Sequence, residues 1–214
     1  MVRRMEQSLY STYIDALVSG DRRVCQGVVD HMLRADTPVL DIYVQIFQRS
    51  MYDVGKMWEE GSISVAVEHL ATAVTERLLA TVYPRIFQAE HIGRSAVITC
   101  APHELHQIGA RMVADAFELN GWDGYFLGAD TPKDDLFSMI NEKKPDIVAL
   151  SASLPRSLDV VLPLLDELRH RFPRQDLIVG GQAFGNSEIQ IRLNEIGVYL
   201  VPTLDELEKL LRSY

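Results

Sequence analysis

The sequence predicts a four-helix bundle followed by a parallel α/β domain with five strands. Two observations carry this prediction. In the first half of the chain, apolar residues recur at steps of three and four, which is the period of an amphipathic helix. In the second half, short runs rich in β-branched residues alternate with amphipathic stretches, which is the pattern of βα units. We therefore expect a helical domain over 1–88, a linker, and an α/β domain over 94–214.

Short polar breaks separate the expected helices of the first domain. They are Gly20-Asp21, Asp36-Thr37-Pro38 and Gly61-Ser62. Asp21 and Thr37 fit N-cap positions, and Pro38 fits the first position of a helix, where its missing N–H is not needed. Helices with such short connections pack as antiparallel neighbours, which predicts a bundle. The expected helices span 5–18, 21–34, 38–60 and 63–87.

In the second domain, each expected strand is followed by a helix. Parallel strands joined in this way form a sheet that is covered on both faces, so we expect a doubly wound domain of the flavodoxin-like type. Ligands of such sheets bind beyond the carboxyl ends of the strands, where the strand order reverses. The expected strands span 95–100, 125–128, 146–153, 176–181 and 198–201, and the expected helices span 106–120, 132–144, 157–172, 186–195 and 203–212.

The composition is that of an acidic globular protein. Hydrophobic residues make up 47% of the chain and the net charge is −9, without a basic stripe, which argues against direct binding of nucleic acid. The chain has no apolar run long enough to span a membrane, and its first residues lack the apolar core of a signal peptide, so we expect a cytoplasmic protein. Cys25 and Cys100 lie far apart without metal-ligand spacing and are interpreted as reduced structural thiols.

A histidine follows the first expected strand, where doubly wound domains bind their ligands. A phosphate-binding loop at this place would need glycines, and none precedes Gly109. Imidazole suits a transition metal instead. Glu104, two residues before His106, is placed to accept the second N–H of the ring and to fix its tautomer. The loop therefore predicts that His106 is a metal ligand.

Small residues follow the third and fourth expected strands. Ser151 and Ser153 end the third strand, and Gly180-Gly181 end the fourth. Glycines at this position allow a bulky group to lie close to the backbone. Ser157 fits the N-cap of the following helix.

Together, these three strand ends resemble the cobalamin-binding domain of methionine synthase and its relatives. That family has Asp-x-His-x-x-Gly after the first strand, Ser-x-Leu after the third and Gly-Gly after the fourth. Here Glu104 replaces the aspartate, and Ser153 stands where the leucine is usual. The resemblance implies that His106 is the lower cobalt ligand of a base-off cobalamin, with Glu104 and Ser157 in a hydrogen-bond relay behind it. The other residues that it implies at the cofactor are Leu105, Gln107, Ile108, Gly109, Ser151, Ser153, Leu154, Gly180 and Gly181.

The helical half carries a second resemblance. Trp58 is followed, after nine residues, by Glu68 and His69, which is the signature of the light-sensing cobalamin-dependent repressors of the CarH/LitR type. By resemblance, Trp58 packs on the upper axial group, and Glu68 and His69 hold an adenosyl moiety. Taken alone, Trp58 at the end of an apolar helical face would be a core residue. Two features of the repressors are missing here: their N-terminal DNA-binding domain, and the histidine that follows the tryptophan, which is Glu59 in this chain.

Three functions fit these residues. The first is a sensor that binds a cobalamin, adenosylcobalamin rather than methylcobalamin, and signals through a separate transcription factor or signalling protein, or through homo-oligomer formation. The second is a corrinoid methyl carrier of a methyltransferase system. Trp58 favours the sensor, because a carrier must bare the upper face of its cofactor. The third is a haem-binding sensor of the same fold, which an absorption spectrum would reveal. No acid–base pair accompanies His106, so we do not expect an enzyme.

Overall fold

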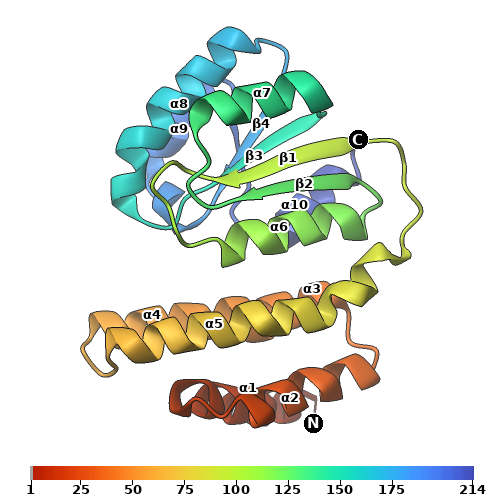
Figure 1. The fold of residues 1–214 in the computed structure, drawn as a ribbon, viewed down its shortest axis with the longest axis vertical. Coiled ribbons are helices and arrows are strands. Elements are labelled where there is room, and N and C mark those ends of the chain that lie inside the picture. Colours follow the sequence, from red (N-terminus) through yellow and green to blue (C-terminus); the bar gives the residue numbers. More distant parts are fainter. Residues whose placement is uncertain (1) are drawn as a thin grey trace. The chain divides into compact units, whose positions relative to one another are not determined.

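The computed structural model describes residues 2–214, with side chains from residue 7 onward. The chain forms two units, Met1–Ile86 and Phe87–Tyr214 (Figure 1). In the part of the chain that the model describes, no helix is both long enough and apolar enough to cross a membrane.

The first unit is helical, as the sequence predicts. The third expected helix is continuous but changes character in its middle, where Tyr43–Gln48 is π-helical and contributes the buried side chains of Tyr43, Ile46 and Phe47. The helices are α1 (Val2–Ser19), α2 (Arg22–Arg34), α3 (Val39–Ile42), α4 (Arg49–Glu59) and α5 (Val65–Val82), followed by a 3₁₀ segment, Tyr83–Gln88.

The N-cap predictions for this unit have mixed outcomes. Asp21 caps α2, since its carboxylate accepts from the backbone N–H groups of Arg23 and Val24. The predictions for Thr37 and Pro38 are both one residue early, because Pro38 is the N-cap of α3 and the helix begins at Val39. Thr37 instead closes the end of α2, where its N–H donates to the carbonyl of Met32 over 3.1 Å. A residue bound into the turn of one helix is not in place to cap the next.

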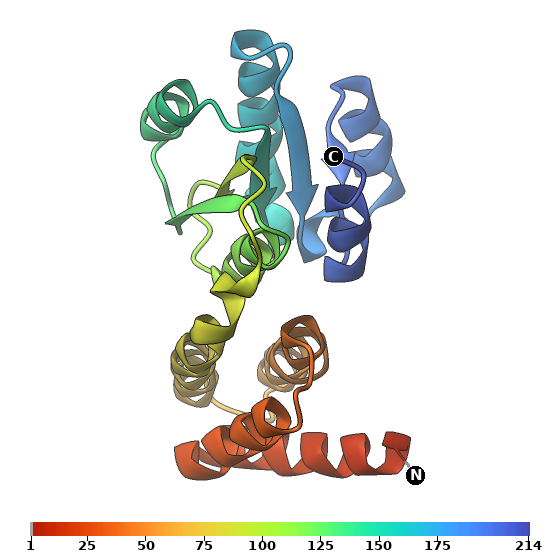
Figure 2. The same cartoon turned by 90° about the vertical axis from the view of Figure 1, so that its right-hand side faces the viewer.

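The second unit is a five-stranded parallel sheet in the order β2-β1-β3-β4-β5, which confirms the predicted fold class. Figure 1 shows α6 and α10 on one face of the sheet and α7 and α8 on the other, and Figure 2 shows the same layers from the side. The strands are β1 (Ser95–Cys100), β2 (Asp123–Gly128), β3 (Ile147–Ser151), β4 (Asp176–Gly180) and β5 (Tyr199–Leu200). The helices are α6 (Ile108–Leu119), α7 (Lys133–Lys143), α8 (Leu158–Arg171), α9 (Ser187–Glu195) and α10 (Leu204–Leu211).

Trp122 belongs to the core of this unit, as expected for a packing residue. It is fully buried, with its ring edge-to-face against Phe117 and Tyr214 at centroid separations of 5.4 and 5.3 Å. Arg94 donates to the carboxylate of Asp146 over 2.7 Å and to the backbone carbonyl of Tyr214 over 3.0 Å. These contacts fix the amino end of β1, so the opposite end of the strand projects from a rigid base.

Two boundaries differ from the sequence prediction where the loops of the sheet begin. The helix expected from residue 106 starts at Ile108, so His106 lies in an irregular loop and not in a helical turn. Likewise, β3 ends at Ser151, and Ser153 lies beyond it. Both segments are held by side-chain hydrogen bonds described below, which hydrophobic periodicity does not encode.

Candidate functional site

The carboxyl ends of β1, β3 and β4 meet at one edge of the sheet. Cys100 is the register partner of Ser151, and Ser151 is the partner of Gly180. The ladder continues past the strands, because Ala152 N–H donates to the Gly180 carbonyl over 3.0 Å. Strand order reverses between β1 and β3, so this edge is the ligand-binding position of a doubly wound sheet.

A single buried carboxylate, that of Glu104, ties two of these loops together. Its Oε1 accepts from the backbone N–H of His106 over 3.1 Å and lies 2.5 Å from Nδ1 of the same residue. Its Oε2 accepts from the backbone N–H groups of Ser153 and Leu154, over 2.9 and 3.2 Å, and from the Ser157 hydroxyl over 3.1 Å. The loop after β1 and the loop after β3 therefore share one anchoring group.

The charge of Glu104 decides the tautomer of the histidine. Burial alone would raise the pKa of this carboxyl group, but hydrogen bonds from the His106 ring, the His106 backbone and the Ser153 backbone outweigh it and hold the pKa at about 2. An ionised carboxylate only accepts hydrogen bonds, so the proton of the neutral imidazole lies on Nδ1 and the lone pair on Nε2. The imidazole side chain is 54% exposed. The loop thus presents a nitrogen donor of fixed orientation, which is what a transition metal in a bound cofactor requires.

Ser157 has one of its two expected roles. It occupies the N-cap position of α8, but its side chain makes no capping hydrogen bond there. The hydroxyl donates to Glu104 instead. The N-cap prediction is wrong for the side chain because Ser157 has helical backbone angles, φ −68° and ψ −18°, and ends the 3₁₀ turn Pro155–Ser157, so the chain is already helical where α8 begins.

The glycine pair after β4 is required by the protein itself. Gly181 has φ +104°, and a Cβ added there would lie 2.2 Å from the carbonyl oxygen of Ala152. A Cβ at Gly180 would lie 2.8 Å from the carbonyl oxygen of Val201. The direction that a side chain would take at each glycine is therefore occupied by neighbouring backbone, and a ligand against the other side of these residues stays a prediction. Gly109 differs, since a Cβ there would make an ordinary contact with the Ser151 hydroxyl.

Replacing Gly181 by alanine is expected to destabilise the second unit by roughly 2–4 kcal/mol, from the overlap with a carbonyl and the unfavourable φ. Urea unfolding measures this loss. Gly121→Ala is the matched control, since Gly121 also has positive φ and a Cβ there would lie 2.3 Å from a carbonyl, that of Glu90. Gly121 does not belong to the loops after β1, β3 and β4, so only Gly181→Ala should also weaken ligand binding in the fraction that remains folded. Equal binding by both variants would contradict a role for the loop after β4.

The other expected residues of this edge lie around the same loop. The side chain of Leu105 is exposed, Ile108 opens α6, and Gln107 precedes that helix with its amide oxygen toward Gly128 at the end of β2. Ser151 lies opposite Gly109.

The contact between Asp130, after β2, and His103 was not predicted from the sequence. Oδ1 of Asp130 accepts from the backbone N–H of His103 over 2.9 Å and lies 3.5 Å from the His103 ring. Both residues have positive φ, +62° at His103 and +50° at Asp130, in the conformation that Asp and His tolerate better than most residues. The loop that carries His106 is therefore also held from the β2 side. The only sequence signal was an aspartate shortly after a strand-ending glycine.

The three expected residues of the helical half belong to the first unit. Trp58 lies near the end of α4 and is 49% exposed, whereas Val54, one turn earlier, is fully buried. Trp58 is therefore not a core residue. Glu68, in the first turn of α5, accepts from Thr72 over 3.2 Å, and its other oxygen lies 3.5 Å from Nε2 of the largely exposed His69.

The fold and the loop after β1 define a class of protein: a doubly wound domain whose ligand-binding edge carries one oriented, half-exposed imidazole. The chain belongs to the B12-binding domain family, whose model matches residues 94–206, and a second B12 binding domain model matches residues 9–83. It is a cobalamin-binding module.

Its relatives are of two kinds. The "HTH-type transcriptional repressor CarH" of Myxococcus xanthus is 31% identical over 164 residues, which are 76% of this chain and 54% of the repressor. The chain thus spans about half the length of that relative. "Trimethylamine corrinoid protein 1" of Methanosarcina acetivorans is 25% identical over 78% of this chain and 80% of its own length. Among solved structures, the monomethylamine corrinoid protein of Methanosarcina barkeri shares the fold, with a TM-score of 0.84 and 20% identity over 97% of this chain and 99% of that one. These relatives confirm the family resemblance.

Proposed function

We propose that this module is an adenosylcobalamin-dependent light sensor that signals through a separate partner protein. The observation that carries the proposal is Trp58, a large aromatic side chain left half exposed at the end of α4 and followed by Glu68 and His69 on α5. Burying such a ring against a ligand stabilises the complex through apolar contact. The likeness to a transcriptional repressor over three quarters of the chain supports the same function.

In this proposal, each group of residues has a distinct task. Nε2 of His106 is the lower ligand, and Glu104 fixes the tautomer and orientation of the ring. Trp58, Glu68 and His69 hold the adenosyl group. The cofactor supplies a cobalt–carbon bond that light can break. The side chains bind and orient, and the protein converts the loss of the upper group into a signal, without acting as an enzyme.

A corrinoid methyl carrier is the second candidate function. It is favoured by the match to a trimethylamine corrinoid protein across four fifths of that protein's length. A carrier would take methylcobalamin and dock with a methyltransferase. In the sensor, the half-exposed Trp58 would contact the adenosyl group of the cofactor. In the carrier, the cofactor would have no such group for Trp58 to contact.

Absorption spectra of the purified protein with adenosylcobalamin and with methylcobalamin test the proposal, in the dark and after illumination, with molecular mass measured in each state. The sensor is expected to bind adenosylcobalamin in the base-off form and to change both its spectrum and its mass, or its affinity for a partner, after light. Cyanide should then bind quickly at the position that the adenosyl group has left. The repressors have a histidine after the tryptophan, whereas this chain has Glu59, and a carboxylate is a poorer cobalt ligand than an imidazole. A preference for methylcobalamin, with no response of the protein to light, would favour the carrier, and a Soret band would indicate haem.

Trp58→Ala is expected to weaken adenosylcobalamin binding by roughly tenfold or more and to leave hydroxocobalamin binding almost unchanged. A buried aromatic contact contributes about 1.5–3 kcal/mol, and only the adenosyl group is large enough to make it. Titration followed by absorbance measures both affinities. Tyr52→Ala is the control, because Tyr52 is equally exposed on the same helix. If Trp58→Ala lowered the affinity for both cobalamins equally, the result would favour the corrinoid methyl carrier.

A further inference from the structure

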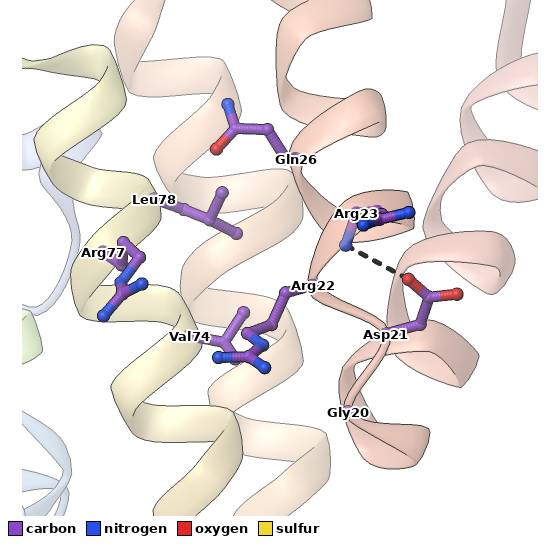
Figure 3. Close-up of a pocket in the computed structure, with 8 residues that line it drawn as sticks. All are labelled: Gly20, Asp21, Arg22, Arg23, Gln26, Val74, Arg77 and Leu78. Atoms are coloured by element: carbon purple, nitrogen blue, oxygen red, sulfur yellow. Dashed lines mark hydrogen bonds between the residues drawn. The ribbon is translucent and has the colours of Figure 1, made fainter.

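The helical unit contains a pocket of its own, between the start of α2 and the middle of α5 (Figure 3). Its volume is about 420 Å³, which lies in the range of small-ligand sites. Val74 and Leu78 of α5 are buried side chains that give it an apolar wall. All of its lining residues belong to the first unit, and none is a residue that the proposed function uses.

Three arginines and one aspartate line this pocket, so its lining carries an excess of positive charge. Figure 3 shows Arg22 extending from the start of α2 toward Val74, and Arg77 on α5, across the gap from α2. Arg23 also lines the pocket. Within the described part of the chain, none of these three arginines takes part in an ion pair, whereas Arg85, Arg94, Arg171, Arg192 and Arg212 all do.

Two carboxylates at or near the pocket accept hydrogen bonds from groups other than these guanidinium groups. Asp21 lines the pocket, but its Oδ1 accepts from the backbone N–H groups of Arg23 and Val24 as the cap of α2. Asp30, one turn beyond the pocket, accepts from the amide of Gln26 over 2.8 Å. Guanidinium groups without ion-pair partners line a pocket here, although the chain as a whole has a net charge of −9. An anion in this pocket would be attracted by the positive charge and would accept hydrogen bonds from the guanidinium groups.

We propose that this pocket binds an oxyanion, a carboxylate or phosphate group, carried on a short apolar stem. The guanidinium groups of Arg22 and Arg77 receive the anion, since arginine donates paired N–H groups in the geometry of a carboxylate or phosphate. The stem lies on Val74 and Leu78. The anion comes either from a free small molecule or from an acidic side chain of a partner protein. This site goes beyond the proposed function and does not depend on it.

The test uses the full cobalamin-loaded chain and two probes. The first is a small anion, either inorganic phosphate or butyrate, titrated by calorimetry. The second is a fluorescent peptide of alternating glutamate and leucine, followed by anisotropy. The variants are Arg22→Gln and Arg77→Gln, with Arg34→Gln as the matched control, since Arg34 is exposed at the far end of α2 and does not line the pocket. Each pocket variant is expected to weaken binding about tenfold, the effect of one charge-assisted hydrogen bond, and the control by less than about twofold.

Each outcome decides the proposal. Binding of a small anion that both pocket variants weaken supports a free oxyanion as the ligand. Binding of the peptide alone, weakened by the same variants, supports an acidic partner. Binding of neither probe, or equal losses in Arg34→Gln, overturns the proposal. The cobalamin spectrum of the three variants should equal that of the unmodified protein, so failure here is distinguishable from failure of the sensor function.

Discussion

His106→Ala is expected to abolish nitrogen ligation from below the cobalt. The imidazole is the oriented donor at the end of β1, and Glu104 holds its lone pair on Nε2. Even a residue behind a metal ligand typically contributes roughly 10- to 100-fold in affinity, so loss of the ligand itself should weaken binding by at least about tenfold. Contacts along the rest of the cofactor would remain, so binding need not vanish. Absorbance titration and electron paramagnetic resonance of the Co(II) state measure affinity and the nitrogen ligand together.

The control for this variant is His103→Asn. His103 lies in the same loop, with an exposed ring, and Asn tolerates its positive φ and keeps the backbone N–H that donates to Asp130. It should retain the affinity and the nitrogen coupling of the unmodified protein. If His106→Ala kept the nitrogen coupling and His103→Asn lost it, the ligand would be His103 and the assignment to His106 would be wrong.

Glu104→Gln is expected to weaken cobalt ligation by His106 while the protein still folds. A glutamine has one acceptor and one donor end, whereas all five of the groups that contact Glu104 are donors. If the amide oxygen serves the loop after β3, the amide N–H₂ faces His106 and favours the tautomer with its proton on Nε2. That tautomer has no lone pair for the metal. We expect a folded protein that binds cobalamin with a loss of about 10- to 100-fold.

Glu104→Ala should cost more, because it leaves every one of these donors without its acceptor. A buried donor left without its acceptor costs roughly 1–3 kcal/mol, and here three backbone N–H groups and one hydroxyl lose theirs. Ser157→Ala is the graded control, since it deletes a single donor and leaves the carboxylate with its other contacts. Thermal unfolding of the three variants without cofactor, and absorbance titration with it, measure the two effects. If Glu104→Ala were as stable as the unmodified protein and bound cobalamin equally well, the carboxylate would have no structural role.

The architecture was predictable from the sequence because periodicity reports which face of an element is buried. The switch from a helical period to β-branched runs predicted the fold class, which is correct. His106 lies in the loop after β1, at the edge where a doubly wound sheet binds its ligands, and its role as a cobalt ligand stays a prediction. Local errors occurred where side chains override the pattern. Glu104 keeps His106 out of α6, and the closing turn of α2 takes Thr37.

Contacts across the strand ends were less accessible to sequence reasoning. Asp130 is separated from His103 by the whole of α6 and β2, and only the folded sheet brings the two together. The exposure of Trp58 was also hidden, because its spacing on α4 continues an apolar face that ends at Val54. A one-dimensional pattern shows which residues share a face, but it does not show where the neighbouring helix stops covering that face.

The glycines after β4 have a consequence for how this fold diverges. Ala152 and Val201 approach the backbone at Gly181 and Gly180 so closely that selection for folding alone retains both glycines. A descendant that had lost its cofactor would be free to change His106, yet it would still be constrained at the glycine pair. Survival of the glycines in a distant homologue therefore reports shared ancestry of the sheet, while survival of the histidine together with its carboxylate reports that the ancestral ligand is still in use.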